Sequence, residues 1–200
     1  HSVFNKLNPP TGLAFNITGP DNYNYTVYYT EFKEDASGNM VYTINLPAGS
    51  TAKEYVVTEI NADVLNYVRT TTYSINGATA IEGSAATVNV VTDDEYTVTF
   101  ENSYDIATGS LEITKIVTPN NIVLPAGLTF TVKDSANNVV ATVLYSDFTN
   151  GSYVINNLPI GDYTVEENVN TAVVENYTLT GASVTNNGAV RIESGATAEV

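Results

Sequence analysis

The stretch Tyr163-Thr164-Val165-Glu166-Glu167 alternates apolar and polar side chains until its last residue. Successive side chains of a β-strand point to opposite faces, so Tyr163, Val165 and Glu167 share one face. The same alternation recurs in 96–100 and 128–132, which are rich in β-branched and aromatic residues, and turn formers such as Asn150-Gly151 lie between such segments. Short strands of this kind predict an all-β sandwich or barrel with no helix longer than a turn or two.

The pattern occurs twice along the chain. Tyr55-Val56-Val57-Thr58-Glu59 matches the stretch above, and a Leu-Pro-x-Gly sequence precedes each copy, at 46–49 and 158–161. This repetition predicts two tandem domains of one family. We expect a first β-sandwich over residues 1–104, a short linker over 105–109 and a second β-sandwich over 110–200. Because 197–200 aligns with 95–98, the second sandwich is expected to lack the end of its last strand.

Composition and charge narrow the classes of function. The chain has 22 Asp and Glu against 7 Lys and Arg, a net charge of −15, which argues against binding nucleic acid or anionic lipid. Its apolar runs are too short for a membrane-spanning helix, so we expect no membrane insertion. There is no Cys, and the one His is His1, so disulfides, thiol catalysis and a Ser-His-Asp triad are excluded from the interior.

We also expect no cofactor and no metal site. Asp93-Asp94-Glu95 offers hard oxygen ligands for Ca²⁺, but it lacks the spacing of a calcium loop, and an acidic turn is the simpler interpretation. Tyr23, Tyr25, Tyr28 and Tyr29 form either a ligand-binding aromatic strip or cross-strand packing, and packing is favoured.

Three polar residues occupy the apolar faces of their strands. Lys115 follows Leu111 and Ile113 on one face, Glu59 follows Tyr55 and Val57, and Asn102 follows Val98 and Phe100. Lys6 corresponds to Lys115 in the first half. Burial drives Lys and Glu toward their neutral forms, and a neutral amine is a nucleophile. A protonated Glu can donate to an amide carbonyl and carry protons, so the set can form a Lys–Asn isopeptide bond with loss of ammonia and no cofactor.

These residues resemble the Cna-B-type and related pilin isopeptide-linkage domains of Gram-positive surface proteins. That family has a Lys on the first strand, a Tyr-x-Val/Leu-x-Glu box and an Asn in a Phe-x-Asn motif on the last strand. Its motifs match Lys6, Glu59 and Asn102 in the first half and Lys115 and Glu167 in the second. The resemblance implies immunoglobulin-like (Cna-B/transthyretin-like) β-sandwiches, a Lys6–Asn102 crosslink, and Glu59 and Glu167 as catalytic proton shuttles.

The chain departs from that family in several places. The second half ends about four residues before the position that would match Asn102, by alignment of the repeat. The Ala-Pro-x-Gly-Tyr continuation after the Glu box is absent, and so is a Tyr-Pro-Lys-Asn motif, so a polymerising shaft subunit is not indicated. Simpler interpretations stay open: lysines with heads in water, exposed strand-end carboxylates, and Asn102 as an interdomain turn residue.

The favoured function is a structural stalk module of a bacterial cell-wall-anchored adhesin or pilus-like surface protein, located outside the cell. Its expected partners are neighbouring domains of the same protein. The alternative is an adhesin module that binds a host glycan or extracellular-matrix protein through loops or the Tyr-rich strand. Enzymatic activity is not expected beyond the single turnover that forms the crosslink.

Overall fold

A computed structural model describes residues 9–200 of the chain, so the candidate Lys6 lies outside the described residues. The chain divides into two compact units, the first ending at Ile106 and the second spanning Ala107–Val200. The all-β prediction is confirmed: the described residues form strands, and their only helical elements are single 3₁₀ turns. No helix within residues 9–200 is long and apolar enough to cross a membrane.

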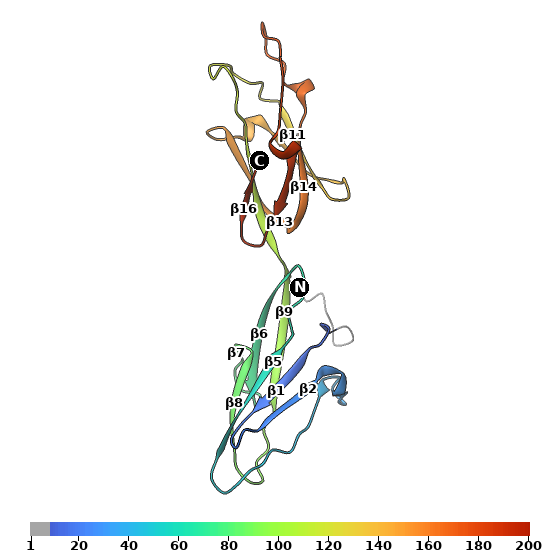
Figure 1. The fold of residues 1–200 in the computed structure, drawn as a ribbon, viewed down its shortest axis with the longest axis vertical. Helices are drawn as coiled ribbons and strands as arrows, with labels where there is room; N and C mark the ends of the chain where they lie inside the picture. The colour runs from blue at the N-terminus through green and yellow to red at the C-terminus, as the bar shows by residue number, and fades with distance from the viewer. Residues whose placement is uncertain (1–8) are drawn as a thin grey trace. The chain divides into compact units, whose positions relative to one another are not determined.

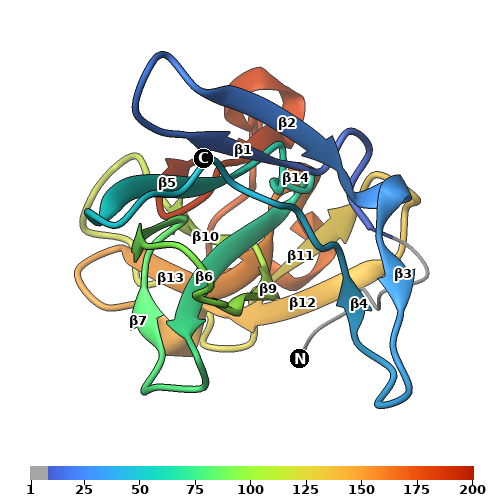
Figure 2. The ribbon, with the colours of Figure 1, turned by 90° about the horizontal axis from the view of Figure 1, so that it is seen from below.

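The first unit consists of two antiparallel sheets and a small hairpin (Figure 1). One sheet has the strand order β2-β1-β5-β8, and the other has the order β7-β6-β9. In Figure 2, β1, β2 and β5 lie in one layer, and β6, β7 and β9 lie in another. The strands of this unit are β1 (Ala14–Thr18), β2 (Asn24–Tyr28), β3 (Lys33–Glu34), β4 (Met40–Val41), β5 (Lys53–Ile60), β6 (Tyr67–Ile75), β7 (Ile81–Glu82), β8 (Ala85–Val90) and β9 (Val98–Ile106).

The second unit also has one four-stranded and one three-stranded sheet, and its larger sheet repeats the order of the larger sheet in the first unit. Its sheets have the orders β12-β11-β14-β15 and β13-β10-β16, and β16 runs parallel to β10. In each unit a 3₁₀ turn follows the second strand of the larger sheet: η1 (Tyr29–Glu31) and η2 (Tyr145–Asp147). The strands of this unit are β10 (Thr108–Thr114), β11 (Thr129–Asp134), β12 (Val139–Leu144), β13 (Ser152–Pro159), β14 (Gly161–Glu167), β15 (Ala189–Ile192) and β16 (Thr197–Glu199); two more 3₁₀ turns are η3 (Val169–Thr171) and η4 (Thr185–Gly188).

The inward positions of the alternating strands form the two cores. In the first unit Ile17, Tyr55, Val88 and Val90 are buried together. In the second unit the buried cluster comprises Leu111, Ile113, Leu128, Phe130, Val132, Leu158, Tyr163, Val165 and Ile192. Removing these side chains from water is the main force that holds the sheets face to face.

The Leu-Pro-x-Gly sequences anchor the strands that carry the glutamates. The hydroxyl of Tyr55 donates to the carbonyl oxygen of Pro47 at 2.5 Å, and that of Tyr163 donates to Pro159 at 2.8 Å. A buried tyrosine needs such a polar partner, and here the preceding loop or strand supplies it. Both copies of the Tyr-x-Val-x-Glu strand are therefore held in the same way.

Two details differ from the expectations. The segment 105–109 is not a free linker, because β9 continues to Ile106 and β10 begins at Thr108. Backbone pairing explains this, since Ile106 lies opposite Tyr67 and Thr108 lies opposite Pro159. In addition, β6 has no counterpart in the second unit, where 172–184 form no strand.

Candidate functional site

Glu59 lies near the end of β5 with its side chain turned into the first unit. Only 2% of that side chain is exposed. The backbone N–H of Glu59 donates to Ser84, and Phe15 of β1 lies directly opposite it in the sheet. Because Tyr55, Val57 and Glu59 share one face of the strand, the carboxyl group of Glu59 points into the space between the sheets. An exposed strand-end carboxylate, the simpler interpretation, is wrong here.

Asn102 approaches Glu59 from the other sheet. It lies within β9, paired with Thr71 of β6, and not in an interdomain turn. Its Nδ2 donates to Glu59 Oε1 at 2.7 Å. The structure therefore joins two predicted site residues, 43 positions apart, by one hydrogen bond between the two sheets.

Two further residues complete the group, and the sequence analysis missed both. The Thr71 hydroxyl lies 2.5 Å from Asn102 Oδ1, and an Arg69 guanidinium N–H donates to the same hydroxyl. Arg69 also pairs with Glu59 at 3.3 Å and with Asp63 at 2.9 Å. One feature of the sequence could have identified them. Arg69 and Thr71 are two residues apart and share a strand face with Tyr67 and Tyr73.

The hydrogen-bond pattern differs from the expected one in one respect. We expected the Glu carboxyl to donate to the amide carbonyl, but the structure pairs the carboxyl with the amide nitrogen and gives the carbonyl oxygen to Thr71. The reason is the position of Thr71, which lies directly opposite Asn102 on the neighbouring strand. The carbonyl has its own donor, which leaves Glu59 beside the nitrogen that would depart.

Burial controls the protonation of Glu59. Desolvation raises the pKa of the Glu59 carboxyl above its ordinary value, and the hydrogen bond from Asn102 and the charge of Arg69 offset part of that rise. A carboxyl with a raised pKa accepts and releases a proton more readily near neutral pH than an exposed glutamate does. Such a group is suited to carry a proton between two nitrogen atoms.

Aromatic rings lie on the strands around the site. The rings of Phe15 and Phe100 lie 5.4 Å apart, and Tyr73 lies 6.1 Å from Phe100. Phe15 is the partner of Glu59 in the sheet, and Phe100 precedes Asn102 on the same face of β9. Apolar rings beside a polar group lower the local dielectric, which strengthens its hydrogen bonds.

The second unit brings together the other two predicted partners. Lys115 Nζ donates to Glu167 Oε2 at 2.8 Å, and the two side chains are 18% and 7% exposed. Glu167 lies opposite Phe130 in the sheet, as Glu59 lies opposite Phe15. Within residues 9–200, no asparagine side chain is hydrogen-bonded to either Lys115 or Glu167. The neighbouring Glu166 points outward and pairs with Lys133.

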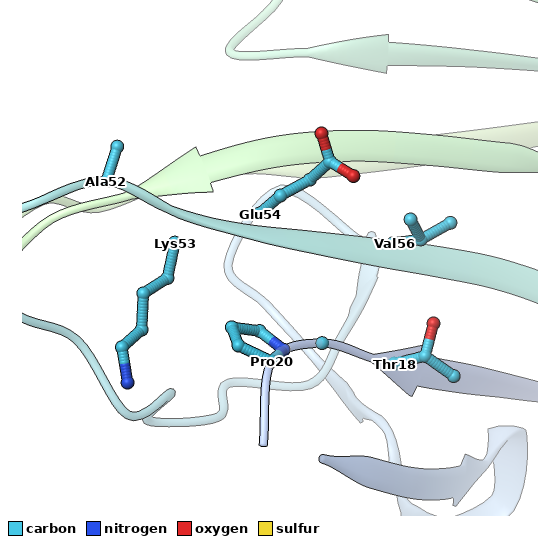
Figure 3. A pocket seen from close by; sticks show the side chains of 7 residues that line it. Thr18, Pro20, Ala52, Lys53, Glu54 and Val56 are labelled. Atoms are coloured by element: carbon cyan, nitrogen blue, oxygen red, sulfur yellow. The ribbon is translucent and has the colours of Figure 1, made fainter. Parts of the chain in front are cut away.

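The remaining candidates carry no comparable arrangement. Among the tyrosines, Tyr23 packs edge-on against Tyr55, and Tyr25 exchanges a hydrogen bond with Tyr42, which is cross-strand and loop packing. The pocket in Figure 3 is an open depression at one end of β5, where Lys53 and Glu54 point in different directions. No group of three potential metal ligands occurs within the described part of the chain.

Comparisons with known proteins bear on the second unit. The structure of the Bacillus anthracis TIE protein matches with a TM-score of 0.34 and 15% identity over 94% of this chain. The match covers 46% of the TIE protein chain, so the present chain spans less than half the length of that protein chain. A search of curated proteins finds no match. Residues 109–196 match the model of the SpaA family, described as a prealbumin-like fold domain, and the resemblance to Gram-positive pilin and surface-protein domains is thereby confirmed.

Proposed function

We propose that this chain is a structural stalk module of a cell-wall-anchored surface protein, stabilised by an isopeptide bond between Lys6 and Asn102. The match of the second unit to the SpaA family supports the coarser role, a structural module of a pilin or surface protein. The observation that carries the finer role is the partly buried hydrogen bond between Glu59 and Asn102.

The nucleophile is inferred from the repeat. Lys115 directly follows β10, the first strand of the second unit, and donates to Glu167, the residue that corresponds to Glu59. Lys6 corresponds to Lys115 in the first half of the sequence. Each unit thus shows two members of the same set of three residues. The first unit pairs the glutamate with an asparagine, and the second unit pairs it with a lysine. Together they describe an amine, a carboxyl and an amide gathered around one buried position.

The chemistry follows from these groups. The neutral Lys6 amine attacks Cγ of Asn102, forming a C–N bond while the carbonyl electrons move onto Oδ1. Glu59 takes a proton from the attacking nitrogen and delivers it to Nδ2, which it already contacts. The carbonyl then re-forms, the Cγ–Nδ2 bond breaks and ammonia leaves. Proximity in a site screened from water replaces any cofactor.

The bond would serve a mechanical role. In the second unit the first and last strands, β10 and β16, are parallel neighbours. With the same arrangement in the first unit, a link between its first and last strands transmits a pulling force past the rest of the domain. It also supplies the covalent closure that a chain without Cys cannot obtain from disulfides.

Intact-mass measurement tests the proposal. The wild-type protein is expected to weigh one ammonia less than its sequence for a single Lys6–Asn102 link, and digestion should release a branched peptide joining the segments around these residues. Lys6→Arg and Glu59→Gln should both restore the unlinked mass. Glu101→Gln is the matched control, because Glu101 is exposed on the opposite face of β9, and it should keep the link. A folded wild-type protein of unmodified mass would refute the crosslink.

A further inference from the structure

Both ends of the Asn102 amide are held in the described site. Nδ2 donates to Glu59 at 2.7 Å, and Oδ1 faces the Thr71 hydroxyl at 2.5 Å. An unreactive buried asparagine needs only satisfied hydrogen bonds. Here, however, the partner of the carbonyl oxygen is itself in contact with a cation, Arg69.

The chemistry of the groups determines the direction of these hydrogen bonds. A guanidinium has only donors, so Arg69 donates to Thr71 Oγ1. The hydroxyl proton of Thr71 then has two acceptors within reach, Asn102 Oδ1 at 2.5 Å and Glu59 Oε2 at 3.5 Å, and the nearer one is Asn102 Oδ1. That assignment requires the carbonyl side of the amide to face Thr71 and the NH₂ side to face Glu59. A chain of donors thus runs from Arg69 through Thr71 to the atom that gains negative charge when an amine attacks Cγ.

We propose that Thr71 is a catalytic hydrogen-bond donor to Asn102 Oδ1 during isopeptide formation, and that Arg69 is the positioning residue that orients and polarises it. This inference rests on the function proposed above and assigns two residues to its reaction. When Lys6 attacks Cγ, the electron pair of the C=O bond moves to Oδ1, where the Thr71 proton stabilises it. When the pair returns and ammonia leaves, Thr71 keeps its proton.

The pairing of strands places these donors before the reaction begins. Thr71 and Asn102 are direct partners in the β6–β9 ladder, and 7% of Thr71 is exposed. Arg69 is fixed on its other side by Asp63 and Glu59. A donor held in place in this way needs no rearrangement as charge develops, which is the condition for efficient stabilisation.

The test measures the rate of ammonia loss. Protein made by cell-free synthesis is sampled after translation stops, denatured and weighed, which gives the linked fraction with time. Thr71→Val keeps the shape but removes the hydroxyl, and a slowing of about 10²–10³-fold is expected for loss of one such donor. Thr71→Ser keeps the hydroxyl and should restore most of the rate. Thr70→Val, on the exposed face of β6, is the matched control and should link as fast as wild type.

Further measurements separate catalysis from folding. Lys6→Arg and Lys6→Arg/Thr71→Val cannot link, so their unfolding free energies report the structural effect of the valine alone. Arg69→Gln retains a donor to Thr71 without the charge and should slow linking less than Thr71→Val does. Linking by Thr71→Val at the wild-type rate, or slowing matched by Thr70→Val, would overturn the assignment. Wild-type protein that never loses ammonia would instead refute the proposed function, so the two failures are distinguishable.

Discussion

Replacing Lys6 with Arg should lower the thermal stability of the first domain by a large and calculable amount. Arginine keeps the positive charge but stays protonated, so it cannot act as the nucleophile. A link between residues 6 and 102 closes a loop of about 100 residues, for which the chain-entropy relation gives about 4.7 kcal/mol at 25 °C. In a domain of this size, 1 kcal/mol corresponds to about 4–8 °C in Tm, so the midpoint should fall by about 20–40 °C.

Differential scanning calorimetry checks this value, because the two compact units should give separate transitions. The Lys6→Arg change should move only the transition of the first domain. Glu59→Gln should produce a similar shift, since both variants lose the same link, although it also removes a buried charge. A Lys6→Arg protein of unlinked mass whose midpoint falls by only a few degrees would refute the loop-closure reasoning. The bond would then matter under force and not at equilibrium.

Two further outcomes follow from individual residues. Burial raises the pKa of the Glu59 carboxyl in the folded protein. In the unlinked Lys6→Arg protein, the free energy of unfolding that Glu59 contributes relative to Gln is therefore fully present below the unfolded-state pKa and is lost as pH rises through the folded-state pKa. Urea unfolding of Lys6→Arg with and without Glu59→Gln measures this contribution, and a difference that does not change with pH would contradict the prediction. Gly188 has a φ of +81°, and a Cβ there would lie 2.1 Å from the Val165 carbonyl oxygen, so Gly188→Ala should destabilise the second domain by about 2 kcal/mol or more. Gly127→Ala, which meets no atom within 4 Å, is the control and should unfold near the wild-type midpoint.

The sequence allowed the strands with clean alternation to be predicted, together with the residues that end their apolar faces. Tyr-x-Val-x-Glu places Glu59 and Glu167 inward, and the same rule places Asn102 and Lys115. Alternation with a period of two residues is a local property of the sequence, so it can be recognised without knowing which strands pair. The contact between Glu59 and Asn102 was accessible only through the family resemblance, because 43 residues separate them.

The roles of Arg69 and Thr71 could not be predicted in the same way. The segment around them contains a run of threonines, Thr70-Thr71-Thr72, in which polarity does not alternate. Which threonine meets Asn102 depends on the register between β6 and β9, a long-range property of the fold. A shift of one residue would turn Thr71 to the outer face and place its neighbours inward. The parallel pairing of β16 with β10 could not be predicted either, because it is also a long-range property of the fold.

The two units differ in the polar groups that surround their inward-facing glutamates. In the second unit Lys115 and Glu167 meet without a bonded asparagine, and the result is a partly buried salt bridge. In the first unit the β6–β9 ladder brings Asn102, Thr71 and Arg69 to Glu59. The described residues of the second unit include no strand that corresponds to β6, because 172–184 form none.

In the reaction proposed above, the two sheets of the first domain have distinct tasks. The sheet containing β5 supplies the proton carrier, and its position is common to both units. The sheet containing β6 and β9 supplies the electrophile and the donors that activate it. The second domain should acquire comparable reactivity only if an asparagine reaches Glu167 and a donor is placed at its carbonyl oxygen.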